Sequence, residues 1–187
     1  MADNAVRNAP EISATPWLKP LAPATRLILH GGGEVRTIAA TVWQVPFAEE
    51  ACRAHVNGSR ATLWMGPDEY LLIDMGPLAV APVATPPVAA LLETALGSLP
   101  HALVDVSHRQ IAFEVRGKHA AAILNGGCPL DLDLAEFPVG MCTRTLCGKA
   151  DILLWRTGAD IFHVEVWRSF SEYLVALLME VARDAAE

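Results

Sequence analysis

The sequence contains little charge, and basic side chains are the minority. Asp, Glu, Lys and Arg make up 19% of the 187 residues, with 14 Lys and Arg against 21 Asp and Glu, so the formal net charge is −7. A field of that sign repels phosphate backbones, and no basic stripe is interleaved with aromatic residues. The composition therefore disfavours nucleic acid as a partner.

The sequence also lacks the segments that direct export or membrane insertion. Its N-terminus has no apolar core of the kind found in signal peptides. The stretch 76–92 carries no charge, but its four prolines exclude a spanning helix over most of its length. We therefore expect a soluble, cytoplasmic protein without a membrane partner.

Cysteine is scarce and shows no metal-binding pattern. The four cysteines are Cys52, Cys128, Cys142 and Cys147, and none forms a C-x-x-C pair. Their spacing matches no common zinc site, so we expect no metal site. Buried thiols in a cytoplasmic protein are the simplest interpretation.

Apolar residues are abundant, at 52% of the chain, and the mean hydropathy is +0.31. This is ample for a core and suggests that a partner covers some apolar surface. Prolines in the region 1–25 predict an extended or disordered arm, which a partner could order through Trp17 and Leu18. The remainder, 26–187, is expected to form a single domain, with two sub-lobes as a further option, joined near 76–87.

Hydrophobic periodicity predicts a mixed α+β fold with mainly antiparallel sheets and a few packed helices. Strands are expected at 26–30, 35–45, 61–65, 70–75, 109–115, 143–148, 151–156 and 160–167. Helices are expected at 47–55, 87–99, 118–124 and from Ser169 to about Arg183, where Ser169 and Glu172 form a capping-box pattern.

The run His30-Gly31-Gly32-Gly33 resembles an oxyanion-hole motif of α/β-hydrolases, in which glycines let backbone amides approach the substrate oxygen. Such an enzyme also needs a G-x-S-x-G nucleophile elbow, and none of the six serines lies in that context. We therefore interpret the run as a glycine turn between strands and reject a hydrolase.

His163 and Glu165 lie on the same face of the last predicted strand, with Trp167 beside them. Residues two apart on a strand can share a ligand or a proton. Such a face is more often solvated or covered by a partner, which is the expectation here.

Other polar clusters predict no active site. Asp105, Ser107 and His108 are close in sequence, but neighbours on an extended segment point to opposite sides, so they do not make a triad. Asp131 and Asp133 are expected in an exposed loop. The chain contains neither a dinucleotide-binding G-x-G-x-x-G nor a Walker A sequence. No catalytic residue is therefore assigned, and cofactor-binding residues remain unknown.

Six short motifs follow one another along the chain. They are LWMGPDEYLL at 63–72, VDVSHR at 104–109, GCPLDL at 127–132, TRT at 143–145, LLWR at 153–156 and RSFSEYL at 168–174. In this order they resemble the gamma subunit of heterotetrameric sarcosine oxidase, over about residues 26–183. The resemblance implies a fold similar to folate-binding aminomethyltransferase domains.

The resemblance also implies a reaction and an assembly. Such a complex demethylates sarcosine to glycine, reduces oxygen to hydrogen peroxide and passes the one-carbon unit to tetrahydrofolate. FAD, FMN, NAD and zinc are then expected in other subunits, with none bound by this chain. The implied partners are the large alpha subunit most directly, together with the beta and delta subunits.

The chain itself is expected to be an accessory or scaffold subunit. No carboxylate matching the catalytic one of the transferases can be placed on it, which weakens any independent folate chemistry. We expect docking through the N-terminal arm and apolar surface that includes some of the five tryptophans, Trp17, Trp43, Trp64, Trp155 and Trp167. Two alternatives remain: a subunit of a related N-methyl amino acid dehydrogenase complex, or a free-standing folate-binding protein.

Overall fold

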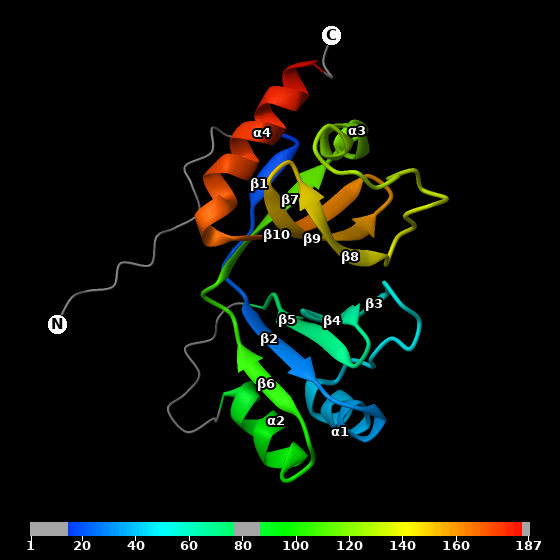
Figure 1. The fold of residues 1–187 in the computed structure, drawn as a ribbon, viewed down its shortest axis with the longest axis vertical. Helices are drawn as coiled ribbons and strands as arrows, with labels where there is room; N and C mark the ends of the chain where they lie inside the picture. Colours follow the sequence, from blue (N-terminus) through cyan, green and yellow to red (C-terminus); the bar gives the residue numbers. More distant parts are fainter. Residues whose placement is uncertain (1–14, 77–86, 185–187) are drawn as a thin grey trace, which may run out of the picture.

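Two five-stranded antiparallel sheets form the centre of the protein (Figure 1). The computed structural model describes residues 15–76 and 87–184. Sheet A has the order β1 (Leu18–Pro20), β7 (Gln110–Arg116), β10 (Ile161–Trp167), β9 (Ala150–Gly158) and β8 (Cys142–Cys147). Sheet B has the order β3 (Ala54–Asn57), β4 (Arg60–Gly66), β5 (Glu69–Asp74), β2 (Thr25–His30) and β6 (Ala102–Asp105).

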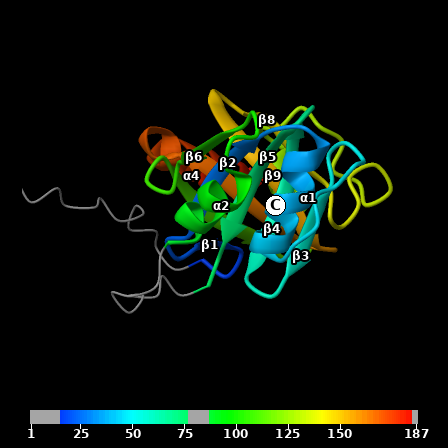
Figure 2. The same cartoon turned by 90° about the horizontal axis from the view of Figure 1, so that it is seen from below.

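Helices cover the outer face of each sheet, so the molecule has four layers (Figure 1). The helices α1 (Gly33–Trp43) and α2 (Val88–Leu96) pack on sheet B and lie side by side beneath it (Figure 2). The helices α3 (Ala120–Asn125) and α4 (Ser171–Asp184) pack on sheet A, and a 3-10 turn at Arg168–Phe170 leads into α4. None of the helices in the described ranges has the length and apolar character needed to cross a membrane.

The inner faces of the two sheets pack against each other, and strand alternation explains how. In β5, Tyr70 and Leu72 belong to the core between sheet B and its helices, whereas Leu71 and Ile73 belong to the cluster between the two sheets. A strand buried on both faces has apolar residues at successive positions, because its side chains alternate between two cores. The predicted α+β class with antiparallel sheets is therefore confirmed.

Most predicted elements are confirmed with small shifts at their ends, but two are wrong. The β-prone run 35–45 is the helix α1, because burying Val35, Ala39 and Trp43 on one face outweighs the weak strand preference of its β-branched residues. The predicted helix at 47–55 is a turn followed by the start of β3. The aromatic ring of Phe47 packs edge-on to Tyr70 at 4.9 Å, and the Tyr70 hydroxyl donates to the Ala48 carbonyl at 2.8 Å.

Part of the predicted N-terminal arm lies in strands of the two sheets. Residues 1–14 and 77–86 lie outside the described residues, but the rest of the predicted arm is part of the fold, since β1 pairs with β7 and Thr25 begins β2. The elements that flank residues 77–86 in the sequence, β5 and α2, both belong to the sheet B half. The chain passes between the two halves at 21–24 and at 106–109.

Replacing a leucine between the sheets should destabilise the whole protein. Leu71→Ala removes a fully buried side chain and should lower the free energy of unfolding by about 2–5 kcal/mol, measured by urea denaturation. Leu91→Ala is the matched control, because Leu91 is exposed on α2 and alanine favours helix. Equal effects of the two substitutions would contradict the four-layer packing.

Candidate functional site

Three buried polar side chains connect the two sheets. Arg26 on β2 donates from Nε to Oε2 of Glu165 on β10 at 2.7 Å, and a second guanidinium nitrogen donates to the Ala24 carbonyl at 3.1 Å. His163, two residues before Glu165 on β10, shares a hydrogen bond of 2.8 Å between its Nε2 and Oε1 of the same carboxylate. An ionised carboxylate only accepts, so this ring nitrogen carries the proton. All three side chains are buried between the sheets.

The surroundings keep Glu165 ionised despite complete burial. Burial raises the pKa of its carboxyl, but the hydrogen bond and charge of His163 and the charge of Arg26 outweigh this and hold the pKa below its usual value. The Trp155 ring lies 5.5 Å from the His163 ring, centroid to centroid, within the same buried layer. The expectation of a solvated or partner-facing surface at His163 and Glu165 is therefore wrong, because sheet B covers this face of β10.

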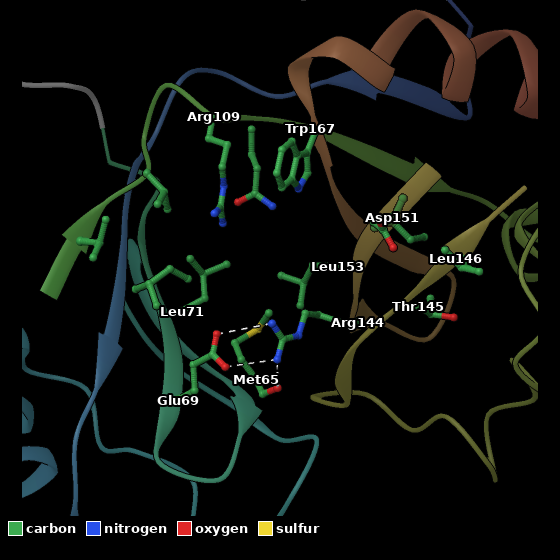
Figure 3. A pocket seen from close by; sticks show the side chains of 15 residues that line it. Met65, Glu69, Leu71, Arg109, Arg144, Thr145, Leu146, Asp151, Leu153 and Trp167 are labelled. Atoms are coloured by element: carbon green, nitrogen blue, oxygen red, sulfur yellow. Dashed lines mark hydrogen bonds and ion pairs between the residues drawn. The ribbon is translucent and has the colours of Figure 1, made fainter. Parts of the chain in front are cut away.

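A cleft of about 560 Å³ opens between the sheets next to this junction (Figure 3). It is lined by Ile28, two residues along β2 from Arg26, and by Trp167, two residues along β10 from Glu165. Its walls are mainly apolar and come from both sheets, with Met65, Leu71, Val104, Val106, Leu146, Ile152 and Leu153 among the lining residues. A concave, largely apolar space with a few polar groups is typical of a binding site.

A cation and an aromatic ring lie together on one side of the cleft (Figure 3). The Arg109 guanidinium carbon is 5.3 Å from the centre of the Trp167 ring, which is the geometry of a cation–π contact. Within the described residues, Arg109 forms no ion pair. The neighbouring Gln110 has a buried Oε1 atom with no hydrogen-bond partner in the same part of the chain.

A second polar contact crosses between the sheets at the opposite side of the cleft (Figure 3). Arg144 on β8 contacts both carboxylate oxygens of Glu69 on β5, at 3.2 and 3.4 Å, and donates to the Met65 carbonyl at 2.8 Å. This pair is substantially exposed, so it contributes little net stability. Its charges are mutually satisfied, which leaves Arg109 as the cation available to a ligand in the cleft.

The remaining predicted candidates have structural roles. An added Cβ at Gly31 would lie 2.6 Å from Cγ1 of Val35, so this glycine is needed where the chain turns tightly into α1. The glycine turn replaces the oxyanion-hole interpretation, although it joins a strand to a helix rather than to a second strand. Asp131 and Asp133 are exposed, as predicted, and each accepts a hydrogen bond at 2.9 Å from the backbone amide two residues later.

The sequence neighbours Asp105, Ser107 and His108 do not form a triad. The Ser107 amide donates to Asp105 Oδ1 at 2.8 Å, and the Ser107 hydroxyl accepts from the Arg26 amide at 2.9 Å. The carbonyl of His108 accepts from Nε of Arg168 at 3.2 Å. These contacts stabilise the segment 106–109, where the chain passes from sheet B back to sheet A.

The tryptophans separate into buried and accessible groups. Trp43 is completely buried, with its Nε1 donating to the Ala61 carbonyl at 3.1 Å, and Trp155 is buried between the sheets. Neither ring can reach a partner, so these two are removed from the expected interface. Trp17 and Trp64 are half-buried and Trp167 is exposed, and for these three the interface stays a prediction.

Three of the four cysteines are buried thiols, as expected. Burial raises the pKa of Cys142 to about 12 and that of Cys147 to about 11, so neither forms much thiolate at neutral pH. Cys128 is also buried, whereas Cys52 is partly exposed. No group of three His, Cys, Asp or Glu side chains in residues 15–76 and 87–184 is placed to hold a metal ion.

The class of fold is shared with an aminomethyltransferase. Aminomethyltransferase T of the glycine cleavage system from Bartonella henselae superposes with a TM-score of 0.60 at 13% sequence identity, covering 87% of this chain and 45% of that chain. At this identity the match shows the fold alone. The described domain is therefore an α+β domain with an aminomethyltransferase-like fold.

The family follows from sequence comparison. Residues 34–184 match the model of the sarcosine oxidase, gamma subunit family, and the chain belongs to that family. The sarcosine oxidase gamma subunits of Corynebacterium sp. strains U-96 and P-1 are 33% and 31% identical, covering 83% and 93% of this chain and 71% and 83% of those proteins. A chain of heterotetrameric sarcosine oxidase from Corynebacterium sp. U-96, solved in complex with pyrrole 2-carboxylate, matches with a TM-score of 0.80 at 29% identity, covering 89% of this chain and 83% of that chain.

Removing the charge of Glu165 should strongly destabilise the fold. Glu165→Gln leaves the buried Arg26 charge uncompensated, and we expect a loss of about 3–5 kcal/mol in urea denaturation at pH 7. The double variant Arg26→Met/Glu165→Gln removes both charges, keeps an acceptor for His163 and should recover much of the loss. A single variant as stable as the wild type would contradict the buried ion pair.

The same variant gives a pH signature. The pKa of Glu165 is lower in the folded protein than its ordinary value of 4.5, so its stabilising effect is present above pH 4.5 and is lost as pH falls through the folded-state value. The stability difference between wild type and Glu165→Gln should therefore shrink as pH falls below 4.5. A difference that stayed constant down to the acid unfolding of the protein would argue against this assignment.

Thiol labelling should single out one cysteine. We expect iodoacetamide at pH 8 to modify Cys52 in the folded chain and to modify all four cysteines in denaturant, because burial protects the other three. Mass spectrometry of proteolytic peptides identifies the labelled site. Cys52→Ser is the control, and rapid labelling of Cys142 in the native protein would show that the sheets do not pack as described.

Proposed function

We propose that this chain is an accessory subunit of a heterotetrameric sarcosine oxidase and contributes no catalytic residue and no cofactor site. Membership of the gamma subunit family supports the assignment to this oxidase. The observation that supports the accessory role is that Glu165 and His163 hold the two sheets together instead of facing a ligand site. Both groups are buried, and Glu165 is hydrogen-bonded to His163 and to Arg26.

The proposed reaction belongs to the assembly as a whole. Sarcosine, oxygen and tetrahydrofolate give glycine, hydrogen peroxide and methylenetetrahydrofolate, with the methyl carbon of sarcosine becoming the transferred one-carbon unit. FAD, FMN, NAD and zinc are assigned to other subunits. The alpha subunit is the proposed direct partner, with beta and delta completing the complex. The name of the Corynebacterium structure, a heterotetrameric sarcosine oxidase, supports an assembly of this kind.

Omitting the chain should disrupt the assembly. The other three subunits are co-expressed with and without this chain, and the products are compared by size-exclusion chromatography and by sarcosine-dependent peroxide formation. We expect loss of the full-size complex and of most activity without it. Unchanged mass and activity would rule out the accessory role. Activity that requires an N-methyl amino acid other than sarcosine would instead favour the related dehydrogenase complex.

Calorimetry separates the proposal from free-standing folate binding. Tetrahydrofolate titrated into the isolated chain should give no saturable heat, because folate chemistry is assigned to another subunit. Tight one-to-one binding by the isolated chain would favour the folate-binding alternative.

A further inference from the structure

We propose that the cleft between the sheets is the docking site for an extended segment of another subunit of the oxidase, apolar in character and carrying a carboxylate. This inference rests on the proposed function and names the surface through which it operates. The supporting observations are the apolar rim of the cleft, the Arg109 side chain, which forms no ion pair with any described residue, and the sheet edges that border the cleft.

The rim of the cleft is apolar and exposed. Val104 on β6, Leu146 on β8 and Trp167 on β10 all line the cleft and are 52%, 47% and 49% exposed. Large apolar side chains that gather around one depression mark an interaction surface. A metabolite inside the cleft would leave these outward parts in water, whereas a protein segment crossing the cleft would cover both the rim and the interior.

The positive charge of Arg109 in the cleft favours a segment that carries an acidic group. Trp167 lies against the Arg109 guanidinium, so the edge of the cation remains free to hold a carboxylate through two parallel hydrogen bonds. Arg144 and Glu69 already satisfy each other. Asp151 also lines the cleft but lies on the β8 side, away from Arg109, so the acidic group belongs at the Arg109 end (Figure 3).

The backbone groups around the cleft favour an extended segment. β6 and β8 both line the cleft, and among the described residues each is the last strand of its sheet, with a paired neighbour on one side only. Edge strands present free amide and carbonyl groups to an added strand. In the part of the chain that the structure describes, the buried Oε1 of Gln110 also has no hydrogen-bond donor, and a backbone amide of the segment would supply one.

Few segments of this chain could themselves fill the cleft and pair with Arg109. The segment 77–86 contains no Asp or Glu and cannot neutralise Arg109. The first fourteen residues contain Asp3 and Glu11, so the experiment must separate them from a partner subunit.

Matched valine variants test the rim. Val104 and Val56 have nearly equal exposure, 52% and 53%, and lie on β6 and β3 at opposite edges of sheet B. Val104→Asp should weaken association of this chain with the other co-expressed subunits by about tenfold or more, while Val56→Asp should leave it within about twofold. Association is measured by titrating the purified chain into the remaining subunits, with thermal unfolding confirming that both variants fold.

Charge reversal tests the acidic partner. Arg109→Glu should weaken association by about tenfold or more and remove its dependence on salt, because a like charge would face the carboxylate. Lys118→Glu is the control, since Lys118 is exposed at the far end of β7 from Arg109. A photo-crosslinker at position 146 should then link to a peptide of another subunit in which Asp or Glu is flanked by apolar residues.

The outcomes separate the two proposals. If the wild-type chain does not associate with the other subunits, the accessory role itself is wrong. If the wild type and all four variants associate equally well, or if the crosslink reaches only residues 1–14 of this chain, the cleft is not the docking site and the accessory role stands. Selective loss with Val104→Asp and Arg109→Glu supports the inference.

Discussion

The structure depends on the burial of two sheets against each other with an ion pair at their junction. Apolar packing supplies most of the favourable free energy, but it does not by itself fix how one sheet sits on the other. Arg26 and Glu165 come from different sheets and are both buried, so any arrangement that separated them would leave a charge without a partner. The pair therefore excludes alternative placements of β2 over β10, and the shape of the neighbouring cleft follows from that placement.

The ionisable groups divide according to exposure rather than residue type. His163 and Glu165 are buried, and their hydrogen bonds are made within the protein. Trp167 lies two residues beyond Glu165 on the same strand, and Arg109 precedes the neighbouring strand β7. Both of these side chains line the open cleft. A chain of the gamma subunit family thus keeps the architecture of an aminomethyltransferase-like domain while its inner polar residues stabilise the fold. Its accessible polar and apolar groups lie where a neighbouring protein can contact them.

The sequence predicts the class of fold and most strands, because the apolar runs of β4, β5, β9 and β10 and the alternation along β7 are local signals. It predicts α1 wrongly, since the helical spacing of Val35, Ala39 and Trp43 is masked by β-branched neighbours. The site was harder to predict. Arg26 lies just before the apolar run 27–29 of β2, which is a weak local signal, and its partner Glu165 lies 139 residues away. The cleft combines residues from strands of both sheets, and no pattern along one strand reveals it.

The position of β1 has a consequence for how the chain acquires its fold. β1 and β7 are neighbours in sheet A, yet every strand of sheet B is made between them. During synthesis β1 therefore cannot pair until β7 has left the ribosome, and by then all the strands of sheet B have been synthesised. Such non-local pairing raises the contact order and slows folding. The two halves are interlaced rather than consecutive, so cutting the chain between them would leave one half without its first strand.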